Sequence, residues 1–321
     1  MNILMTRRLF EQDIDYIKKG IKKRTDKPFQ LIELTEYTEE NILSRCEEAD
    51  VLLGPFVTET IVEKANRLKF IQIPWTGLDT FNFKAVQKFS GIICNSHSNS
   101  NSVSEFGVAL LLNLIKKISF HDQLMRTGDW NRDEKAMTLK SMSLSNAKIG
   151  IMGYGAIGRK MGKILKGFGS EIYVLANKDV QFPEITEIFA FSRLKEFCNQ
   201  VDIIICSLPL TEETRGVFGT DVFNEIENKP YIVNVSRAEI FEPRALYDAL
   251  SNDSISGYAS DVWWNPNQEL DFERFSNVVF SPHRAGYVEG ALPHLDDVIT
   301  NLANFITGGE VLNIVNITNQ Y

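Results

Sequence analysis

Short apolar runs rich in β-branched residues alternate with longer stretches of helical periodicity along the whole chain. This alternation is typical of α/β proteins, in which helices connect the parallel strands of a buried sheet. In the first hundred residues the runs that predict strands are NILMT, FQLIEL, DVLLG, KFIQIP and GIICN. In the remainder they are KIGIM, EIYVL, VDIIICSLP, YIVNVS, ISGYASDVW and NVVFSP. The pattern therefore predicts an α/β protein with two groups of parallel strands.

The stretch SVSEFGVALLLNLIKKISFHDQLMRTGDW lies between the two groups and has the periodicity of one long helix. Ser102 and Glu105 have the spacing of a capping box, so we expect the helix to begin at Ser102. Its broad apolar face indicates burial between two bodies. A last helix, within ALPHLDDVITNLANFITGG, should end at Gly308 and Gly309. The β-like tail VLNIVN follows, and spacing alone leaves open whether it packs on the first group of strands.

With 321 residues the chain exceeds the size at which a single hydrophobic core keeps growing, which predicts two domains. Its 44% hydrophobic and 24% charged residues are ordinary for a globular protein. The formal net charge of -8 argues against a nucleic acid or an anionic membrane surface as partner, since either needs a basic patch. No uncharged apolar run is long enough to span a membrane.

The four cysteines show neither CxxC nor paired spacing, so neither a disulfide framework nor a metal site is indicated. The amino terminus MNILMTRRLF lacks the longer apolar segment and the cleavage site of a signal peptide. A reduced, cytoplasmic location without a bound metal is therefore expected.

A nucleotide-binding pattern, Gly153-x-Gly155-x-x-Gly158, directly follows KIGIM and opens the next helical stretch. In this context Gly153 permits a tight turn, Gly155 lets the backbone approach a pyrophosphate, and Gly158 lets the helix pack on the sheet. The amino terminus of the helix offers free N–H groups to the phosphates. The pattern predicts a Rossmann-like dinucleotide-binding domain with a doubly wound sheet of six strands, between Ser102 and Gly286.

The acid that usually binds the adenosine ribose, about 20 residues beyond the glycines, is missing. Ala176 stands there, followed by Asn177 and Lys178. A carboxylate would repel the 2′-phosphate of NADP, whereas an amide and a cation can bind it. We therefore expect a preference for NADP(H). The alternative is that Lys178 is a solvated loop residue and that the site takes NAD(H) as well.

Two residues whose side chains could take part in a reaction follow strands of the second group. Arg237 comes just after YIVNVS, and His283 comes just after NVVFSP. Ligands of doubly wound sheets bind at the carboxyl ends of the strands. A guanidinium can hold the carboxylate and carbonyl of a 2-oxo acid, while an imidazole supplies the proton that accompanies a hydride. The pair therefore favours a nicotinamide-dependent reduction of a keto group.

The chain resembles the D-2-hydroxyacid dehydrogenase family along nearly its whole length. The matching segments, in the family's order, are GLD, NSVSE, GYGAIG, CSLPLTEETRGVF, VNVSRAEIFEPRALYDAL, ASDVWW and SPHRAG. The resemblance implies two Rossmann-like, doubly wound domains: a discontinuous substrate domain of residues 1–101 and 287–321, and an inserted NAD(P)-binding domain of residues 102–286. It also implies hydride transfer between a nicotinamide cofactor and a small 2-oxo or 2-hydroxy acid, in a homodimer.

The resemblance further implies roles for single residues. Arg237 would bind the substrate carboxylate and polarise the carbonyl, and His283 would be the acid/base residue. The backbone near Thr76, Gly77 and Leu78 would hold the carboxylate from the other side. Cofactor contacts are implied for Gly153, Gly155, Ala156, Ile157, Gly158, Asn177, Lys178, Leu208, Pro209, Thr214, Asp261 and Gly286.

The sequence departs from the family where a glutamate usually pairs with the histidine. The segment DVWWNPNQELDF is shorter and places Asn265 before proline, as in formate dehydrogenases of the same superfamily. Asn99 stands where those enzymes use an asparagine on the substrate. Either Glu269 or Asp271 replaces the missing acid and keto reduction proceeds normally, or His283 works against Asn265. We favour a reductase or dehydrogenase of 2-oxo and 2-hydroxy acids, with formate oxidation as the alternative.

A function of another class stays open. Nicotinamide-sensing corepressors resemble these dehydrogenases and keep their site residues, and a fold by itself does not decide function. The sequence shows no partner-binding tail and no basic patch, which favours the enzyme.

Overall fold

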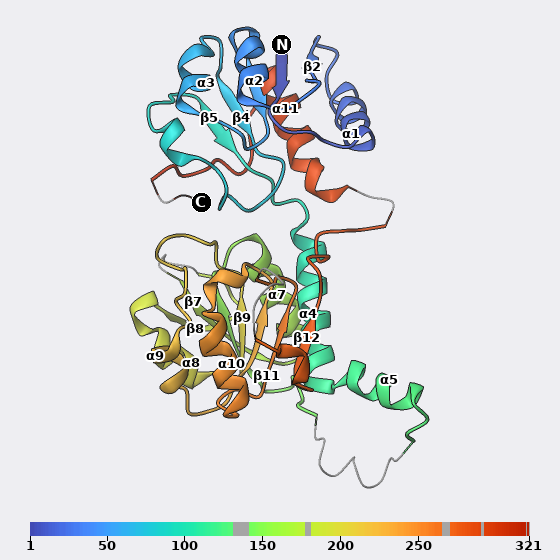
Figure 1. Cartoon of the computed structure of the whole chain (residues 1–321), viewed down its shortest axis with the longest axis vertical. Coiled ribbons are helices and arrows are strands. Elements are labelled where there is room, and N and C mark those ends of the chain that lie inside the picture. Colours follow the sequence, from blue (N-terminus) through green and yellow to red (C-terminus); the bar gives the residue numbers. More distant parts are fainter. Residues whose placement is uncertain (131–140, 177–180, 265–269, 290–291, 319, 321) are drawn as a thin grey trace. The chain divides into compact units, whose positions relative to one another are not determined.

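The computed structural model describes residues 1–130, 141–176, 181–264, 270–289, 292–318 and 320 (Figure 1). The chain divides into two units, each of which has its own sheet and its own core. Unit 1 consists of Met1–Asn99 together with Tyr287–Tyr321, and unit 2 consists of Ser100–Gly286. Both units are α/β structures with parallel sheets, so the predicted fold class is confirmed.

Unit 1 contains a five-stranded parallel sheet, and all five strands that the apolar runs predict are present. The strand order is β2 (Gln30–Ile32), β1 (Asn2–Met5), β3 (Val51–Leu53), β4 (Phe70–Gln72) and β5 (Ile92–Cys94). Its helices are α1 (Glu11–Lys22), α2 (Glu39–Arg45), α3 (Glu59–Lys64) and α11 (Asp296–Thr307), with 3₁₀ turns at Cys46–Glu48, Phe83–Val86 and Pro293–Leu295.

The two faces of this sheet are covered by different helices, because successive side chains of a strand point to opposite faces. Ile3 and Met5 of β1 belong to the core under α1 and α11, whereas Leu4 belongs to the core under α2 and α3. Helices α1 and α11 lie side by side (Figure 1). Their approach is close: a Cβ atom at Gly20 would lie 2.6 Å from Cδ1 of Ile299.

The carboxyl-terminal segment returns to the sheet of unit 1. Helix α11 ends at Gly308, whose φ of +84° is the left-handed conformation that favours glycine, as the sequence predicts. The tail then forms an isolated antiparallel bridge between Cys94 and Ile314, in which the Val315 amide donates to the Ile93 carbonyl at 2.8 Å. The tail therefore packs on the first group of strands, beside β5, which the spacing in the sequence left open.

Unit 2 contains a parallel sheet of seven strands, one more than expected. The order is β12 (Val278–Phe280), β11 (Gly257–Ser260), β10 (Tyr231–Asn234), β9 (Ile203–Cys206), β6 (Lys148–Met152), β7 (Glu171–Leu175) and β8 (Ile185–Phe189). The six predicted strands are present, and β8 is the additional one. Because β8 is an edge strand whose sequence ITEIF carries polar residues, it lacks the continuous apolar run that marks the others.

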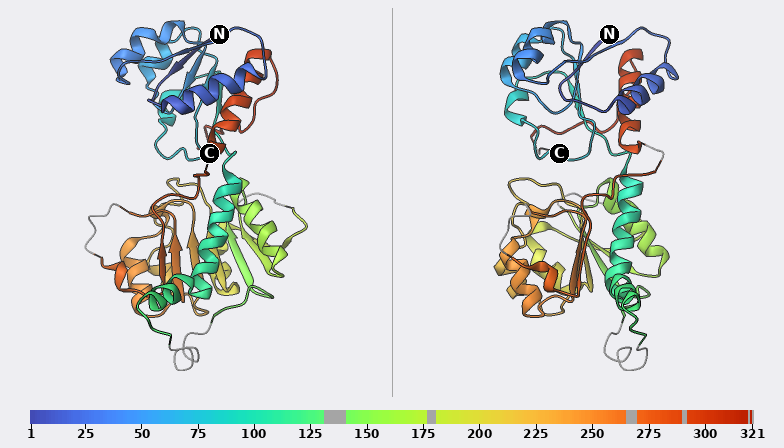
Figure 2. Two further views of the ribbon diagram at one scale, coloured as in Figure 1. Left: turned by 90° about the vertical axis from the view of Figure 1, so that its right-hand side faces the viewer. Right: turned by 45° about the vertical axis from the view of Figure 1, so that its right-hand side comes forward.

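Helices cover both faces of this sheet (Figure 2). Helices α4 (Ser100–Lys116) and α7 (Ala156–Gly167) share one core with the sheet, and α8 (Leu194–Gln200), α9 (Thr220–Asn224) and α10 (Pro243–Ser251) share the other. Short 3₁₀ turns occur at Phe191–Arg193, Ala238–Ile240 and Phe272–Arg274.

The expectation of one long helix that begins at Ser102 is wrong in two respects. Helix α4 begins at Ser100, and the Ser102 hydroxyl donates to the Ala285 carbonyl at 2.6 Å instead of capping the helix. The helical path also breaks at Lys117, whose φ is +55°, and a separate helix α5 covers Ile118–Arg126. Ser102 does not cap the helix because its hydroxyl is bonded to a residue far along the chain. The helix is interrupted because Lys117 has a left-handed backbone conformation.

All four cysteines are buried free thiols. Burial raises the pKa of Cys94, Cys198 and Cys206 to about 12, so these thiols are protonated at neutral pH. In the part of the chain that the structure describes, no helix combines the length and the apolar character needed to cross a membrane.

Candidate active site

The glycine loop joins β6 to α7 at the position where the strand order of unit 2 reverses, between β6 and β9. Gly153 has a φ of +81°, and a Cβ atom there would lie 3.0 Å from the Ser207 carbonyl oxygen. A Cβ atom on Gly158 would lie 2.2 Å from the Gly153 carbonyl oxygen, so the first turn of α7 needs glycine to approach β6. Gly155 precedes the helix, and the space beside its Cα atom is open.

The loop after β9 lies against this glycine loop. The Ser207 hydroxyl donates to the Gly153 carbonyl at 2.7 Å, and Leu208 is buried beside it. The buried Thr214 hydroxyl donates to the Pro209 carbonyl at 2.7 Å and thereby holds the loop in shape. The structure thus brings together three groups of predicted cofactor residues: the glycines, Ala156 with Ile157 at the start of α7, and Leu208 with Pro209 and Thr214.

These loops fit a dinucleotide on structural grounds. The first turn of α7 presents unpaired backbone N–H groups beside a loop that has no room for side chains at Gly153 and Gly158. The open space at Gly155 leaves the backbone accessible to a pyrophosphate. Among the residues that the structure describes, no group of three or more His, Cys, Asp or Glu side chains could hold a metal ion.

The segment after β7 is the expected position of the ribose. Ala176 is half-buried, and its amide donates to the Phe189 carbonyl at 3.0 Å. The predicted cofactor residues Asn177 and Lys178 lie outside the described residues. Farther along, the Tyr154 hydroxyl of the glycine loop donates to Oε1 of Glu184 at 2.9 Å. Burial, together with this hydrogen bond, raises the pKa of Tyr154.

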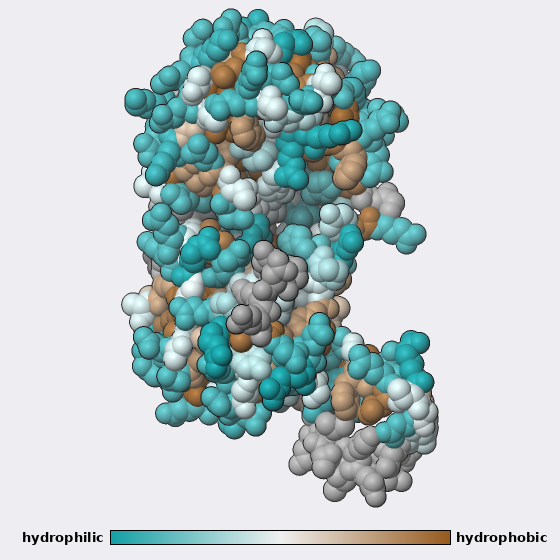
Figure 3. Space-filling view, viewed as in Figure 1, coloured by the Kyte–Doolittle hydropathy of each residue, from teal (hydrophilic) through white to brown (hydrophobic). Residues whose placement is uncertain are grey.

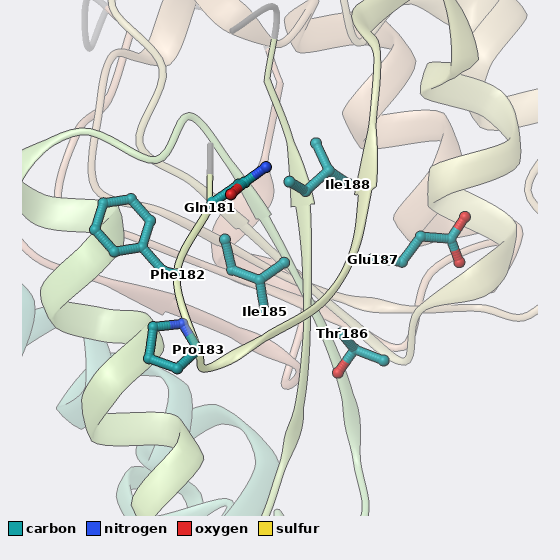
Figure 4. Close-up of a pocket in the computed structure, with 7 residues that line it drawn as sticks. All are labelled: Gln181, Phe182, Pro183, Ile185, Thr186, Glu187 and Ile188. Carbon is teal, nitrogen blue, oxygen red and sulfur yellow. The ribbon is translucent and has the colours of Figure 1, made fainter. Parts of the chain in front are cut away.

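A shallow pocket of about 450 Å³ follows the same segment along β8 (Figure 4). It is lined by Gln181, Phe182, Pro183, Ile185, Thr186, Glu187 and Ile188. None of the described site residues lines it, and it lies at the edge strand, away from the reversal point at β6 and β9. This pocket is therefore a surface feature of the edge strand and not the candidate site.

Arg237 follows β10 and is held by buried polar groups. The Asn234 side chain, at 0% exposure, donates to the Arg237 carbonyl at 2.9 Å and accepts the Ser236 amide at 3.0 Å. The Ser236 hydroxyl donates to the Leu208 carbonyl and so links this loop to the predicted cofactor loop. The Arg237 guanidinium itself donates to the Ser236 carbonyl at 2.9 Å. These contacts fix the backbone from which the guanidinium extends.

His283 lies in an exposed turn after β12 and has a φ of +57°. The turn is held by the buried carboxylate of Asp261, which directly follows β11. Its two oxygen atoms accept the amides of Arg284 at 2.7 Å and Ala285 at 2.9 Å. The Ala285 carbonyl in turn accepts the Ser102 hydroxyl. Asp261, predicted to contact cofactor, therefore also holds the backbone on the carboxyl side of His283, next to the predicted residue Gly286.

The substrate residues predicted in unit 1 follow β4 and β5, which are neighbours in its sheet. The Thr76 hydroxyl donates to the Ser96 carbonyl at 2.7 Å and contacts Oδ1 of Asn99 at 3.3 Å. The Thr76 carbonyl accepts the side-chain amide of Asn95 at 2.7 Å. Gly77 and the buried Leu78 continue the same loop. The structure thus brings Thr76 and Asn99 together.

The predicted partners of His283 divide between described and undescribed residues. Asn265 and Glu269 lie outside the described residues, and the exposed Asp271 precedes the 3₁₀ turn Phe272–Arg274. The sequence reading missed Ser207, Asn234 and Ser236, which hold the loops. The signal for Asn234 was a polar residue inside the apolar run YIVNV, because such a residue is buried only when its side chain is hydrogen-bonded.

Residues 108–285 match the family of D-isomer specific 2-hydroxyacid dehydrogenases, at its NAD binding domain. The chain is 28% identical over 295 residues to D-3-phosphoglycerate dehydrogenase of Methanocaldococcus jannaschii, an alignment that covers 89% of this chain but only 55% of that protein. It is 28% identical over 289 residues to glyoxylate reductase of Aeropyrum pernix, with 86% of each chain covered. A crystal structure from Pyrococcus horikoshii OT3 has a TM-score of 0.80 and 25% identity, with 99% of this chain and 98% of that chain covered.

The family match includes more than half of the chain and contains the glycine loop, Arg237 and His283. The resemblance seen in the sequence is therefore confirmed. The chain belongs to the D-isomer-specific 2-hydroxyacid dehydrogenase family, whose members transfer a hydride between NAD(P) and 2-hydroxy or 2-oxo acids.

Proposed function

We propose that the chain is a reductase of small 2-oxo acids that prefers NADPH, with unit 2 binding the nucleotide and unit 1 contributing to substrate binding. The proposal rests on two buried polar side chains at the ends of neighbouring strands of unit 2, each of which is hydrogen-bonded to the backbone of a loop. Asn234 holds the backbone of Arg237, and Asp261 holds the turn that contains His283. Buried polar groups cost free energy unless they are paired, so their use to hold the backbone beside Arg237 and His283 supports a functional site there.

The bound nicotinamide would supply the hydride. Arg237 would hold the substrate carboxylate and polarise the keto oxygen, because its planar guanidinium presents several donors in fixed geometry. The hydride is added to the keto carbon while the His283 imidazolium gives its proton to the keto oxygen, which yields the 2-hydroxy acid. The loop of Thr76, Gly77 and Leu78 would bind the carboxylate, and Asn99 would orient it through Thr76.

The residue that pairs with His283 is part of the proposal. Asp271 is one candidate, and Asn265 and Glu269 are the others. An opposite charge near the imidazole would favour its protonated form, whereas the amide of Asn265 would do so less. Because formate oxidation needs no proton donor, an Asn265 partner would favour formate as substrate.

The first experiment is a spectrophotometric assay of NADPH and NADH oxidation with glyoxylate, hydroxypyruvate and pyruvate, alongside NADP reduction with formate. We expect oxidation of NADPH by at least one 2-oxo acid. Turnover with formate alone would replace the proposed reaction by formate oxidation. Nucleotide binding without turnover of any of these compounds would favour a nicotinamide-sensing regulator.

The cofactor preference predicts the effect of restoring the missing acid. Ala176→Asp should lower the affinity for NADPH by about 10- to 100-fold, since a carboxylate would face the 2′-phosphate, and should improve binding of NADH. Fluorescence titration of each cofactor measures both changes. Ala176→Ser serves as the control, because it adds a polar group without charge. Equal affinities of the unchanged protein for NADH and NADPH would contradict the preference.

We also propose that the chain forms a homodimer through α5. This helix projects from the rest of unit 2 and carries apolar side chains on its surface (Figures 1 and 3). It has no buried residue, and Ile118 is 55% exposed and Met125 is 47% exposed. A second copy of the chain would bury these side chains, because exposed apolar clusters mark interfaces. A cytoplasmic location belongs to the same proposal, since the four cysteines are free thiols.

The proposed dimer predicts that Ile118→Glu with Met125→Glu yields monomers, which analytical ultracentrifugation would detect. The double variant Asp122→Lys and Arg126→Glu is the control, because it reverses an exposed i, i+4 ion pair on the same helix without changing the apolar side chains. A monomer for the unchanged protein at micromolar concentration would contradict the dimer.

A further inference from the structure

The sheet of unit 1 has its own reversal of strand order, and several residues at the strand ends beside it have no role in the proposed reaction. The order β2-β1-β3-β4-β5 reverses between β1 and β3, and ligands of such sheets bind at the carboxyl ends of the strands next to this point. The residues there are Thr6 and Arg7 after β1, Gly54 after β3, and Trp75 after β4. Because β1, β3 and β4 are consecutive neighbours, these strand ends adjoin one another.

Arg7 is held against the proposed carboxylate-binding loop. Its guanidinium carbon lies 4.6 Å from the centre of the Trp75 ring, the geometry of a cation–π contact. Trp75 directly precedes Thr76, and the Trp75 carbonyl accepts the Ser96 amide at 3.2 Å. The same Ser96 accepts the Thr76 hydroxyl through its carbonyl. The indole, the proposed substrate loop and the guanidinium thus form one connected group.

The guanidinium of Arg7 forms no ion pair with any residue that the structure describes, although Arg7 is exposed and the chain carries an excess of acids. Stacking on an indole uses the face of a guanidinium and leaves its N–H donors at the edge. These donors point outward within the plane of the guanidinium and suit the two oxygen atoms of a carboxylate or phosphate.

The carboxyl end of β1, which leads into Arg7, is closely packed against the end of β3. Thr6 is 1% exposed, and its hydroxyl has no hydrogen-bond partner among the described residues. Gly54 has a φ of +135°, and a Cβ atom there would lie 2.6 Å from the Thr6 hydroxyl and 3.2 Å from the Arg7 amide nitrogen. Any other residue at position 54 would displace Thr6 and Arg7. A buried unpaired hydroxyl and a restricted glycine are costly features, which are retained more often at functional sites than elsewhere.

We propose that Arg7, held on Trp75, binds a second anionic group of the substrate, a carboxylate or phosphate on the side chain of the 2-oxo acid. This inference rests on the proposed function, in which Arg237 and the Thr76 loop bind the first carboxylate. It narrows the substrates to dianionic 2-oxo acids. An arginine that merely covers the indole would account for the stacking alone and would leave all substrates equally affected by its removal.

The test compares Arg7→Ala with the unchanged protein on four substrates in the presence of saturating NADPH. Glyoxylate and hydroxypyruvate carry one anionic group, oxaloacetate carries a second carboxylate, and 3-phosphohydroxypyruvate carries a phosphate. We expect kcat/KM for at least one dianionic substrate to fall by about 10- to 100-fold, mainly through KM, while the values for glyoxylate and hydroxypyruvate stay unchanged. Whether oxaloacetate or phosphohydroxypyruvate is affected distinguishes a carboxylate ligand from a phosphate.

Arg8→Ala is the matched control, because Arg8 is the adjacent exposed arginine and has no stacking partner among the described residues. It should leave the substrate preference unchanged. An equal loss on all four substrates, or no change on any, would overturn the role of Arg7. If no 2-oxo acid is reduced at all, the proposed function fails. The inference is then tested by calorimetric binding of malonate and of inorganic phosphate to the protein with NADPH, where loss of binding in Arg7→Ala supports it and unchanged binding overturns it.

Discussion

Replacing His283 with glutamine is expected to lower kcat for 2-oxo acid reduction by about 10²- to 10⁴-fold, the usual contribution of a positioned proton donor. Glutamine is polar and of similar size but cannot deliver a proton at neutral pH. The affinity for NADPH should stay unchanged, because the backbone of the turn is fixed through Arg284 and Ala285. Stopped-flow measurement of NADPH oxidation and fluorescence titration of NADPH separate the two effects.

The control for this change is His121→Gln, since His121 is exposed on α5. It should retain full activity. A His283→Gln variant that loses NADPH affinity to the same extent as activity would indicate a structural role instead. Retained formate oxidation in the same variant, together with unchanged keto reduction, would show that His283 is not the proton donor.

Replacing Arg237 with alanine should reduce kcat/KM for 2-oxo acids by about 10²- to 10³-fold, because one partner of a hydrogen-bonded charge pair is removed. Both KM and kcat should change. KM should rise because the contact with the substrate carboxylate is lost, and kcat should fall because the carbonyl is no longer polarised. Arg237→Lys should recover little, since an ammonium does not reproduce the planar fork. Steady-state kinetics over a range of substrate concentrations provide both terms.

Chemical rescue makes this prediction specific to the guanidinium. Added guanidinium chloride at low millimolar concentration should restore part of the activity of Arg237→Ala and should not affect Arg237→Lys. Arg244→Ala is the control for the fold, because Arg244 is an exposed residue of the nearby α10 that pairs with Asp248. Full activity of Arg237→Ala without added guanidinium would contradict the assignment.

The strands were predictable because most of them are buried on both faces and therefore appear as uninterrupted apolar runs. Edge strand β8 was not, since Glu187 and its other polar residues break the run. The start of α4 was misplaced because the sequence pattern at Ser102 and Glu105 is local, whereas the Ser102 hydroxyl is bonded to Ala285 far along the chain. Tertiary contacts of this kind leave no local signal.

The sequence could predict which types of residue form the site, but not which residues hold their loops in place. The glycine spacing indicates the turn at Gly153 and the close approach at Gly158 because both follow from backbone geometry. The support of the His283 turn by Asp261 depends on a loop that returns beside β11, so spacing could not indicate it. The roles of Arg237 and His283 in catalysis stay predictions, as does the preference for NADPH.

The buried state of the four cysteines makes the chain convenient for optical measurement. Thiol reagents attack thiolates, and the native thiols of Cys94, Cys198 and Cys206 are both protonated and inaccessible at neutral pH. A cysteine introduced on the surface can therefore be labelled with a dye while the native residues stay in place. One such cysteine in each unit would allow energy transfer to report whether the distance between the two dyes changes when NADPH binds, in a protein that otherwise retains its natural sequence.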